Sequence, residues 1–196
     1  MLDRLVKSLD VILGNSYEIS LFRSIFTLVF FSMARIGELI PANIENSFKV
    51  LQLENIHFEY ISTENTRMLI SFCHFKHNTS NTPHTIPVEI CSDNPSICAV
   101  NCLKQFLVKR GSASGPLFLS RNGSLLLRSR FDKITKLSLA FCGLDSSRYK
   151  GHSFRIGGAF EAARKGYTDS QIRLMGRWKS DAFKKYIRAP ALNFNS

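Results

Sequence analysis

The residues best suited to chemistry lie between Gly151 and Arg188, in the stretch GHSFRIGGAFEAARKGYTDSQIRLMGRWKSDAFKKYIR. His152 and Arg155 stand three residues apart, and Tyr186 stands near the end of the stretch among basic side chains. A phenol is an oxygen nucleophile, and grouped cations bind an anionic phosphodiester. These residue types therefore predict covalent chemistry on DNA strands. The alternatives are an ordinary surface pair for His152 and Arg155, and a core position for the tyrosine.

A second cluster lies within the run FFSMARIGELI. Arg35 directly follows an apolar segment that is predicted to be a buried helix, and Glu38, three residues on, can hold its guanidinium. The alternative is a purely structural Arg–Glu pair. Lys76 stands at the end of a predicted strand, between His77 and the nearby His74. A lysine at a hairpin tip, taken alone, is more often an ordinary solvated turn residue.

The HxxR pair is predicted to lie at the start of a helix. Ser153 is a good helix cap, so a helix over residues 153–165 would place Arg155 in its first turn, where unpaired N–H groups already attract an anion. Gly157 and Gly158 in this helix cost about 1 kcal/mol each relative to alanine. The two glycines therefore predict that another part of the chain packs closely against that face.

Taken in chain order, the arginine, the lysine, the HxxR pair, the Gly-Arg-Trp run and the tyrosine resemble the catalytic domain of the tyrosine recombinase (phage integrase) family. The likeness is closest to the recombinases of eukaryotic mobile elements of the DIRS and Crypton kinds, because YKGHSFRIGGA followed by LMGRWKSDAFKKYIR is very similar to their C-terminal signature. The resemblance covers about residues 16 to 190. It implies a metal-independent site-specific DNA recombinase that needs no cofactor. It also implies a homo-oligomer (a tetramer) on double-stranded DNA, at work in the nucleus in DNA integration and recombination.

The resemblance also implies roles for single residues. Arg35 and Arg155 would hold the scissile phosphate, His152 would be the histidine of the pocket, and Tyr186 would be the nucleophile. The two remaining matches are Lys76, as the hairpin lysine, and Glu38, as the acidic support of the first arginine.

One position departs from the family pattern. The family usually has His, sometimes Trp, directly after the glycine that precedes the tyrosine by ten residues. In this chain Arg177 follows Gly176, and Trp178 comes one residue later. The count favours Arg177, whereas the indole N–H, which can donate to a phosphate oxygen, favours Trp178. Both residues are therefore candidate catalytic residues.

The chemistry is consistent with these roles without the family likeness. A tyrosine with a pKa near 10 is neutral at physiological pH, so it must lose its proton as it attacks, and His152 can accept that proton. Attack on phosphorus builds charge on the non-bridging oxygens, which two forked arginines bind bidentately. Lys76 can protonate the leaving 5′ oxygen. The product is a covalent 3′-phosphotyrosyl link that keeps the bond energy, so religation needs no ATP.

Positive charge is concentrated in the second half of the chain. Residues 1–100 contain 7 Lys and Arg against 10 Asp and Glu, whereas residues 101–196 contain 19 against 5. A basic half beside a near-neutral half predicts a nucleic acid partner rather than scattered solvated cations. The basic side chains that we expect to bind DNA are Lys150, Lys179, Lys184, Lys185 and Arg188.

Two other classes of site are disfavoured. A metal-dependent nuclease needs clustered carboxylates, and the five acidic residues of the basic half are widely scattered. The five cysteines form no CxxC pair and no set of zinc ligands. We therefore expect neither a metal nor a cofactor. The alternative that stays open is a non-catalytic DNA-binding remnant of a mobile element.

The elements that must position these residues are mostly helical. Strands are predicted over residues 55–61, 67–75 and 85–90, with a further short strand over 116–120. The fold class is therefore α+β, mainly α, a tyrosine recombinase catalytic-domain fold with a small antiparallel β-sheet on one side. We expect a single catalytic domain over residues 1–196 without the family's N-terminal core-binding domain. We expect no membrane partner, because the most apolar run, residues 24–34, is too short to span a bilayer. Helices are predicted over residues 2–12, 16–33 (capped by Ser16), 37–41, 98–110, 128–142, 153–165 and 169–176, and from residue 181.

Overall fold

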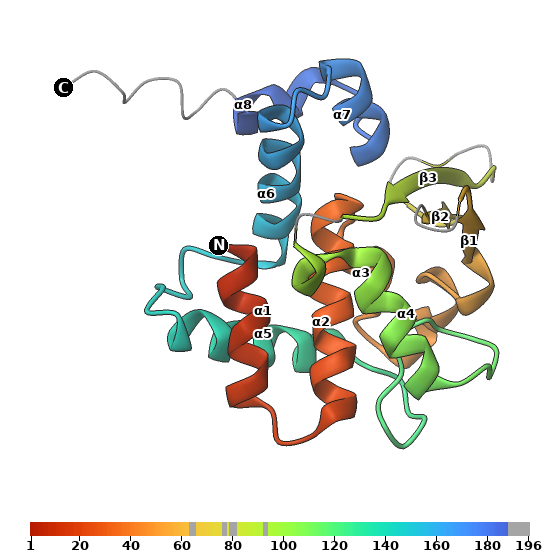
Figure 1. Ribbon diagram of the computed structural model, residues 1–196, viewed down its shortest axis with the longest axis vertical. Helices are drawn as coiled ribbons and strands as arrows, with labels where there is room; N and C mark the ends of the chain where they lie inside the picture. The colour runs from red at the N-terminus through yellow and green to blue at the C-terminus, as the bar shows by residue number, and fades with distance from the viewer. Residues whose placement is uncertain (63–65, 76–77, 79–81, 92–93, 188–196) are drawn as a thin grey trace.

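The computed structural model describes residues 1–62, 66–75, 78, 82–91 and 94–187, and it is mainly helical with a small antiparallel sheet (Figure 1). The predicted fold class is confirmed. The helices are α1 (Leu2–Ile12), α2 (Ser16–Phe31), α3 (Ile36–Leu39), α4 (Ala99–Arg110), α5 (Arg128–Phe141), α6 (Gly151–Arg164), α7 (Asp169–Gly176) and α8 (Lys184–Ile187). Short 3-10 helices are η1 (Ile44–Lys49), η2 (Leu53–Asn55), η3 (Pro95–Ile97) and η4 (Asp181–Phe183), and the strands are β1 (Ile56–Tyr60), β2 (Thr66–Phe72) and β3 (His84–Glu89).

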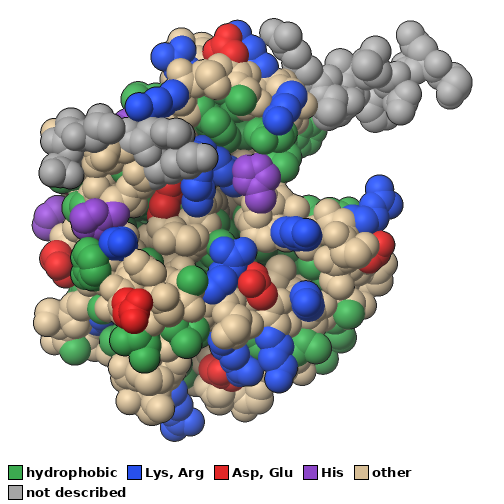
Figure 2. All heavy atoms as spheres, turned by 180° about the vertical axis from the view of Figure 1, so that it is seen from behind, with side chains coloured by type: hydrophobic (Ala, Val, Ile, Leu, Met, Phe, Trp, Pro, Cys, Tyr) green, Lys and Arg blue, Asp and Glu red, His purple; other side chains and the backbone are tan. Residues whose placement is uncertain are grey.

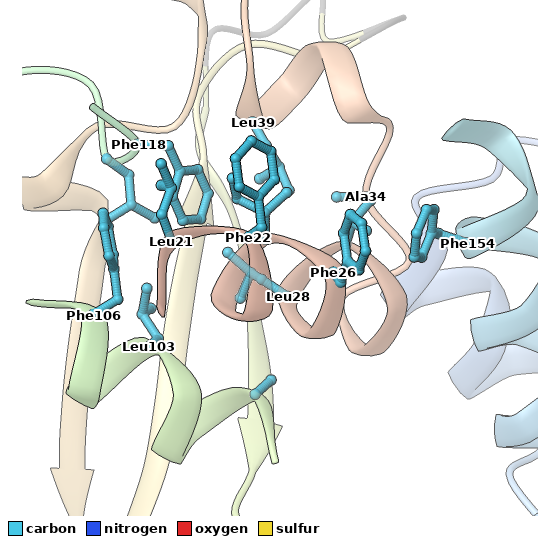
Figure 3. Packing of buried hydrophobic residues seen from close by; sticks show 14 of the residues in the cluster. Leu21, Phe22, Phe26, Leu28, Ala34, Leu39, Leu103, Phe106, Phe118 and Phe154 are labelled. Carbon is cyan, nitrogen blue, oxygen red and sulfur yellow. The ribbon is translucent and has the colours of Figure 1, made fainter. Parts of the chain in front are cut away.

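Helix α2 is the central element of the hydrophobic core. It contacts α1, α4 and α6, and its apolar side chains between Leu21 and Val29 are buried. The Phe26 ring packs against Phe131 of α5 at 5.9 Å between centroids and against Phe154 of α6 at 5.1 Å. Figure 3 shows Phe26 facing Phe154, with Ala34 beside it. Aromatic contacts of this kind fix α6 on α2, so that α6 is held firmly where it carries the HxxR pair.

The sheet lies at one side of the helices and packs on α4 (Figure 1). Its strand order is β1-β2-β3, so β2 is the middle strand, as predicted. Alternate side chains of β2 are buried, among them Met68, Ile70 and Phe72, which is the period of two expected for a strand with one face on the core. Pro87 stands in β3, at an edge of the sheet, where its missing N–H breaks no ladder.

The glycine pair of α6 lies against the end of α2, which confirms the predicted close packing. A Cβ on Gly158 would overlap the backbone carbonyl oxygen of Phe30. A Cβ on Gly157 would come to 2.9 Å from Cε2 of the Phe30 ring. Glycine is therefore required at Gly158 by a backbone neighbour, and at Gly157 only by a side chain that can rotate.

Three local predictions were wrong. Helix α6 begins at Gly151 with Lys150 as its N-cap, because the Ser153 hydroxyl accepts the Lys150 N–H from inside the helix at 3.1 Å. Arg155 consequently lies in the second turn rather than the first. The cap of α2 is Asn15, not Ser16, because the Asn15 side chain accepts the N–H of the third helical residue. Residues 116–120 form isolated bridges instead of a strand.

Candidate active site

Five of the residues predicted to act on a phosphodiester come together from four separate elements. Arg35 is the residue before α3, His152 and Arg155 lie on α6, Trp178 follows α7, and Tyr186 lies on α8. Figure 2 shows a histidine with Lys and Arg side chains around it where this face of the molecule is hollowed. The fold therefore joins groups that are more than a hundred residues apart in the chain.

His152 and Tyr186 form the most direct contact of the site. His152 Nε2 lies 3.3 Å from Tyr186 Oη, and the two rings pack edge to face at 5.8 Å between centroids. Burial, followed by the positive charges of Arg155, Arg35 and Lys185, lowers the pKa of His152 below its usual 6.5. The imidazole is therefore neutral at physiological pH, which leaves a ring nitrogen able to accept the phenol proton.

Arg155 is held by backbone groups from two sides. Its Nη1 donates to the Met33 carbonyl oxygen at 2.7 Å, and its Nη2 donates to the Gly176 carbonyl oxygen at 2.5 Å. Burial, followed by repulsion from Arg35, lowers its pKa to about 9, so the guanidinium is still charged at neutral pH. The side chain is only 1% exposed. A phosphate can reach this guanidinium only if one of the surrounding contacts opens.

The Trp178 side chain covers Arg155. The Arg155 guanidinium lies 4.1 Å from the indole ring centroid, a cation–π contact, and the indole also packs on Phe183 at 5.4 Å. Gly176 makes room for this ring, because a Cβ on Gly176 would overlap it. Trp178 therefore joins the arginine of α6 to the segment that carries Tyr186.

Arg177 points into the protein instead of into the pocket of His152. Its Nη2 lies 2.5 Å from Glu38 Oε2, and its guanidinium lies 3.8 Å from the centroid of the Phe72 ring in β2. Glu38 in turn accepts from Arg35 Nη1 at 3.1 Å. Burial lowers the pKa of Arg177, and the Glu38 carboxylate opposes that shift.

The cations predicted to bind DNA have different surroundings. Lys150, Lys179 and Lys185 are exposed. Lys184 forms ion pairs with Asp169 at 3.3 Å and Asp181 at 2.8 Å, so two carboxylates offset its charge. Lys76 and Arg188 lie outside the described residues.

Among the described residues, no group of three or more His, Cys, Asp or Glu side chains could hold a metal ion. Within the same part of the chain, no helix is both long enough and apolar enough to cross a membrane.

Three contacts of the site were not foreseen from the sequence. Phe72 stacks under Arg177, the Met33 carbonyl accepts from Arg155, and His84 of β3 lies with Nε2 3.2 Å from the Leu174 carbonyl oxygen of α7. A backbone carbonyl or a ring face has no signature in an amino-acid pattern. The positive φ of Met33, 48°, becomes visible only in the structure.

No protein-family model matches the chain, and no curated protein matches it in sequence. Solved structures match it in three dimensions. The XerH site-specific recombinase bound to its difH substrate in a pre-cleavage complex is similar with a TM-score of 0.68 and 16% identity, over 94% of this chain and 48% of that one. The XerH post-cleavage complex with palindromic difH gives 0.66 and 16%, over 95% and 47%.

The XerA recombinase gives a TM-score of 0.60 and 16% identity, over 95% of this chain and 56% of that one. The chain thus spans about half the length of the solved structures that it matches. At this identity the likeness shows the fold, and the fold is that of a tyrosine recombinase catalytic domain.

Proposed function

We propose that this protein is a tyrosine recombinase that cuts and rejoins DNA strands through a covalent 3′-phosphotyrosyl intermediate. The observation that carries the proposal is the 3.3 Å approach of His152 Nε2 to Tyr186 Oη, beside the guanidinium groups of Arg35 and Arg155. A nucleophile, a neutral base and two cations are what attack on a phosphodiester requires.

The reaction balances with the groups present. Tyr186 Oη forms a bond to phosphorus as its proton passes to His152, and the bond from phosphorus to the 5′ oxygen breaks. Arg35 and Arg155 offset the charge that grows on the non-bridging oxygens. Lys76 is proposed to supply the proton that the leaving oxygen takes up. The reverse attack by a 5′ hydroxyl of another strand completes the exchange.

The similar XerH structures support DNA as the substrate, because both are described as complexes with a difH substrate. The uneven charge supports it too, since residues 101–196 contain 19 Lys and Arg against 5 Asp and Glu. A homotetramer on DNA, a single catalytic domain, a nuclear location and an origin in a mobile element of the DIRS or Crypton kind follow from the sequence resemblance, and they stay predictions.

The second candidate is a DNA-binding remnant without catalysis. The burial of Arg155, which is 1% exposed, favours it, since a phosphate cannot reach that side chain in the arrangement observed. The two candidates differ in whether Arg155 becomes accessible on DNA.

The experiment that separates them uses a pool of nicked duplexes of randomised sequence, incubated with the protein in EDTA. A nick close to the cut site lets the short leaving strand diffuse away and traps the covalent adduct. The recombinase predicts a protein–DNA species that survives SDS. A protein that retards the pool in a gel but forms no such species is a DNA-binding remnant.

A further inference from the structure

Arg177 carries a deeply buried charged side chain beside the site. Its side chain is 1% exposed, its guanidinium stacks on Phe72, and its Nη1 donates to the Met175 carbonyl oxygen at 3.0 Å. The backbone of Arg177 has φ 55° and ψ 42°, a left-handed conformation that non-glycine residues seldom adopt. A conformation of this kind persists only where the surrounding contacts hold it in place.

The Glu38 carboxylate links Arg177 to Arg35. Oε2 of Glu38 accepts from Arg177 Nη2 at 2.5 Å and from the Arg35 backbone N–H at 3.0 Å. Oε1 accepts from Arg35 Nη1 at 3.1 Å. One buried carboxylate therefore joins the two guanidinium groups.

The two arginines differ in what they face. The Arg35 side chain is 33% exposed, whereas that of Arg177 is 1% exposed. Arg35 therefore opens toward the surface where a phosphate would arrive, and Arg177 does not. A lone Arg35–Glu38 pair would be neutral, but the three groups together carry one net positive charge.

We infer that Arg177 is a positioning residue for Arg35, acting through Glu38, and not a phosphate ligand. Arg177 binds the Glu38 carboxylate from the protein interior, and that carboxylate orients the Arg35 guanidinium. It also offsets the Glu38 charge, so that Arg35 meets the scissile phosphate as a full cation. This inference rests on the proposed function, because it assigns Arg177 a part in that reaction.

A double-mutant cycle tests it. Arg177→Met, Glu38→Gln and the double variant are compared with the wild type for the rate of covalent adduct formation on the nicked duplex pool at saturating DNA. Each rate is corrected for the folded fraction measured by circular dichroism. Arg173→Met is the matched control, because Arg173 is an exposed arginine in the last turn of α7, the helix that Arg177 follows.

Each single variant is expected to slow cleavage about tenfold to hundredfold, because displacing a phosphate-binding group by about 1 Å can cost up to about a hundredfold. The double variant is expected to be no slower than Glu38→Gln alone, because both substitutions remove the same Arg177–Glu38 ion pair. The salt dependence of duplex binding is expected to be unchanged in Arg177→Met. Arg173→Met is expected to cleave at the wild-type rate.

Multiplied losses in the double variant, or a salt slope reduced by about 1 in Arg177→Met, would mark a direct phosphate contact and overturn the inference. If Arg177→Met does not fold, Arg177→Lys is tested in its place, since it keeps a cation beside Glu38. It is expected to cleave within about tenfold of the wild type, given a charge-assisted bond to the same carboxylate. A loss in Arg177→Lys beyond that range overturns the charge-offset argument. Wild-type protein that forms no adduct refutes the proposed function itself, which separates the two failures.

Discussion

Replacement of Gly158 by alanine tests how α6 is held on α2. The new Cβ would overlap the Phe30 carbonyl oxygen and come to 3.3 Å from Met33 Cγ. Overpacking costs about 1–3 kcal/mol, and because a backbone atom cannot rotate away we take the upper part of that range, about 2–3 kcal/mol, while the gain in helix propensity returns about 1 kcal/mol. The expected net loss in the free energy of unfolding is about 1–2 kcal/mol. For a chain of this size that lowers the melting temperature by roughly 2–8 °C.

Gly157→Ala is the matched control on the same helix. Its Cβ would meet only the Phe30 ring, at 2.9 Å, and that ring can turn aside. We expect its stability to lie between the wild-type value and a gain of about 1 kcal/mol. Both variants are compared by urea unfolding and by adduct formation. Gly158→Ala displaces His152 and Arg155 with α6, so its cleavage is expected to fall by up to about a hundredfold. Equal stability of the two alanine variants would refute this account of the α2–α6 contact.

Three further predictions concern the charges and rings of the site. Because the pKa of His152 is lowered, the imidazole stays neutral to a lower pH than usual. The single-turnover rate of adduct formation is therefore expected to stay constant down to about pH 6.5 and to fall only below that pH. A rate that already falls between pH 8 and 7 would contradict a neutral His152 base. Lys185→Ala is expected to reduce the salt slope of duplex binding, measured by fluorescence anisotropy, by about 1. Lys184→Ala is expected to reduce it by less, because Asp169 and Asp181 already pair with Lys184. Equal slopes for the two variants would contradict this difference. Trp178→Ala removes the cation–π partner of Arg155. It is expected to lower the free energy of unfolding by about 2 kcal/mol or more, measured by thermal unfolding, and to slow cleavage strongly. Cleavage at the wild-type rate in that variant would exclude Trp178 from the site.

The helix and strand pattern could be predicted where local signals and tertiary packing agree. Helix α7 runs over Asp169–Gly176 as predicted, with Thr168 accepting the Gln171 N–H at its start. Helix α4 ends before Gly111, whose φ of 79° suits glycine. The start of α6 was missed because a serine hydroxyl serves a helix equally well from the cap and from the third position.

The candidate site could be predicted as a set of residues but not as a geometry. The basic residues next to Tyr186 and the spacing of His152 and Arg155 are patterns in the sequence, and the structure brings these side chains together. The pairing of Arg177 with Glu38 joins residues 139 positions apart, and the Phe72 ring of β2 lies against the same guanidinium. Tertiary contacts of that range leave no trace in a single sequence. The glycine pair indicated close packing, and only the fold shows that the neighbour is a backbone carbonyl.

The central claim is that the Tyr186 oxygen attacks the phosphodiester, and peptide mapping of the trapped adduct tests it most directly. The adduct from the nicked duplex pool is digested with nuclease and protease, and the tyrosine that carries the nucleotide is identified by mass spectrometry. The account predicts a nucleotide on Tyr186 alone, no adduct in Tyr186→Phe despite near-normal duplex binding, and full adduct in the control Tyr167→Phe. An adduct that persists in Tyr186→Phe, or that maps to Tyr167 or Tyr149, would contradict it.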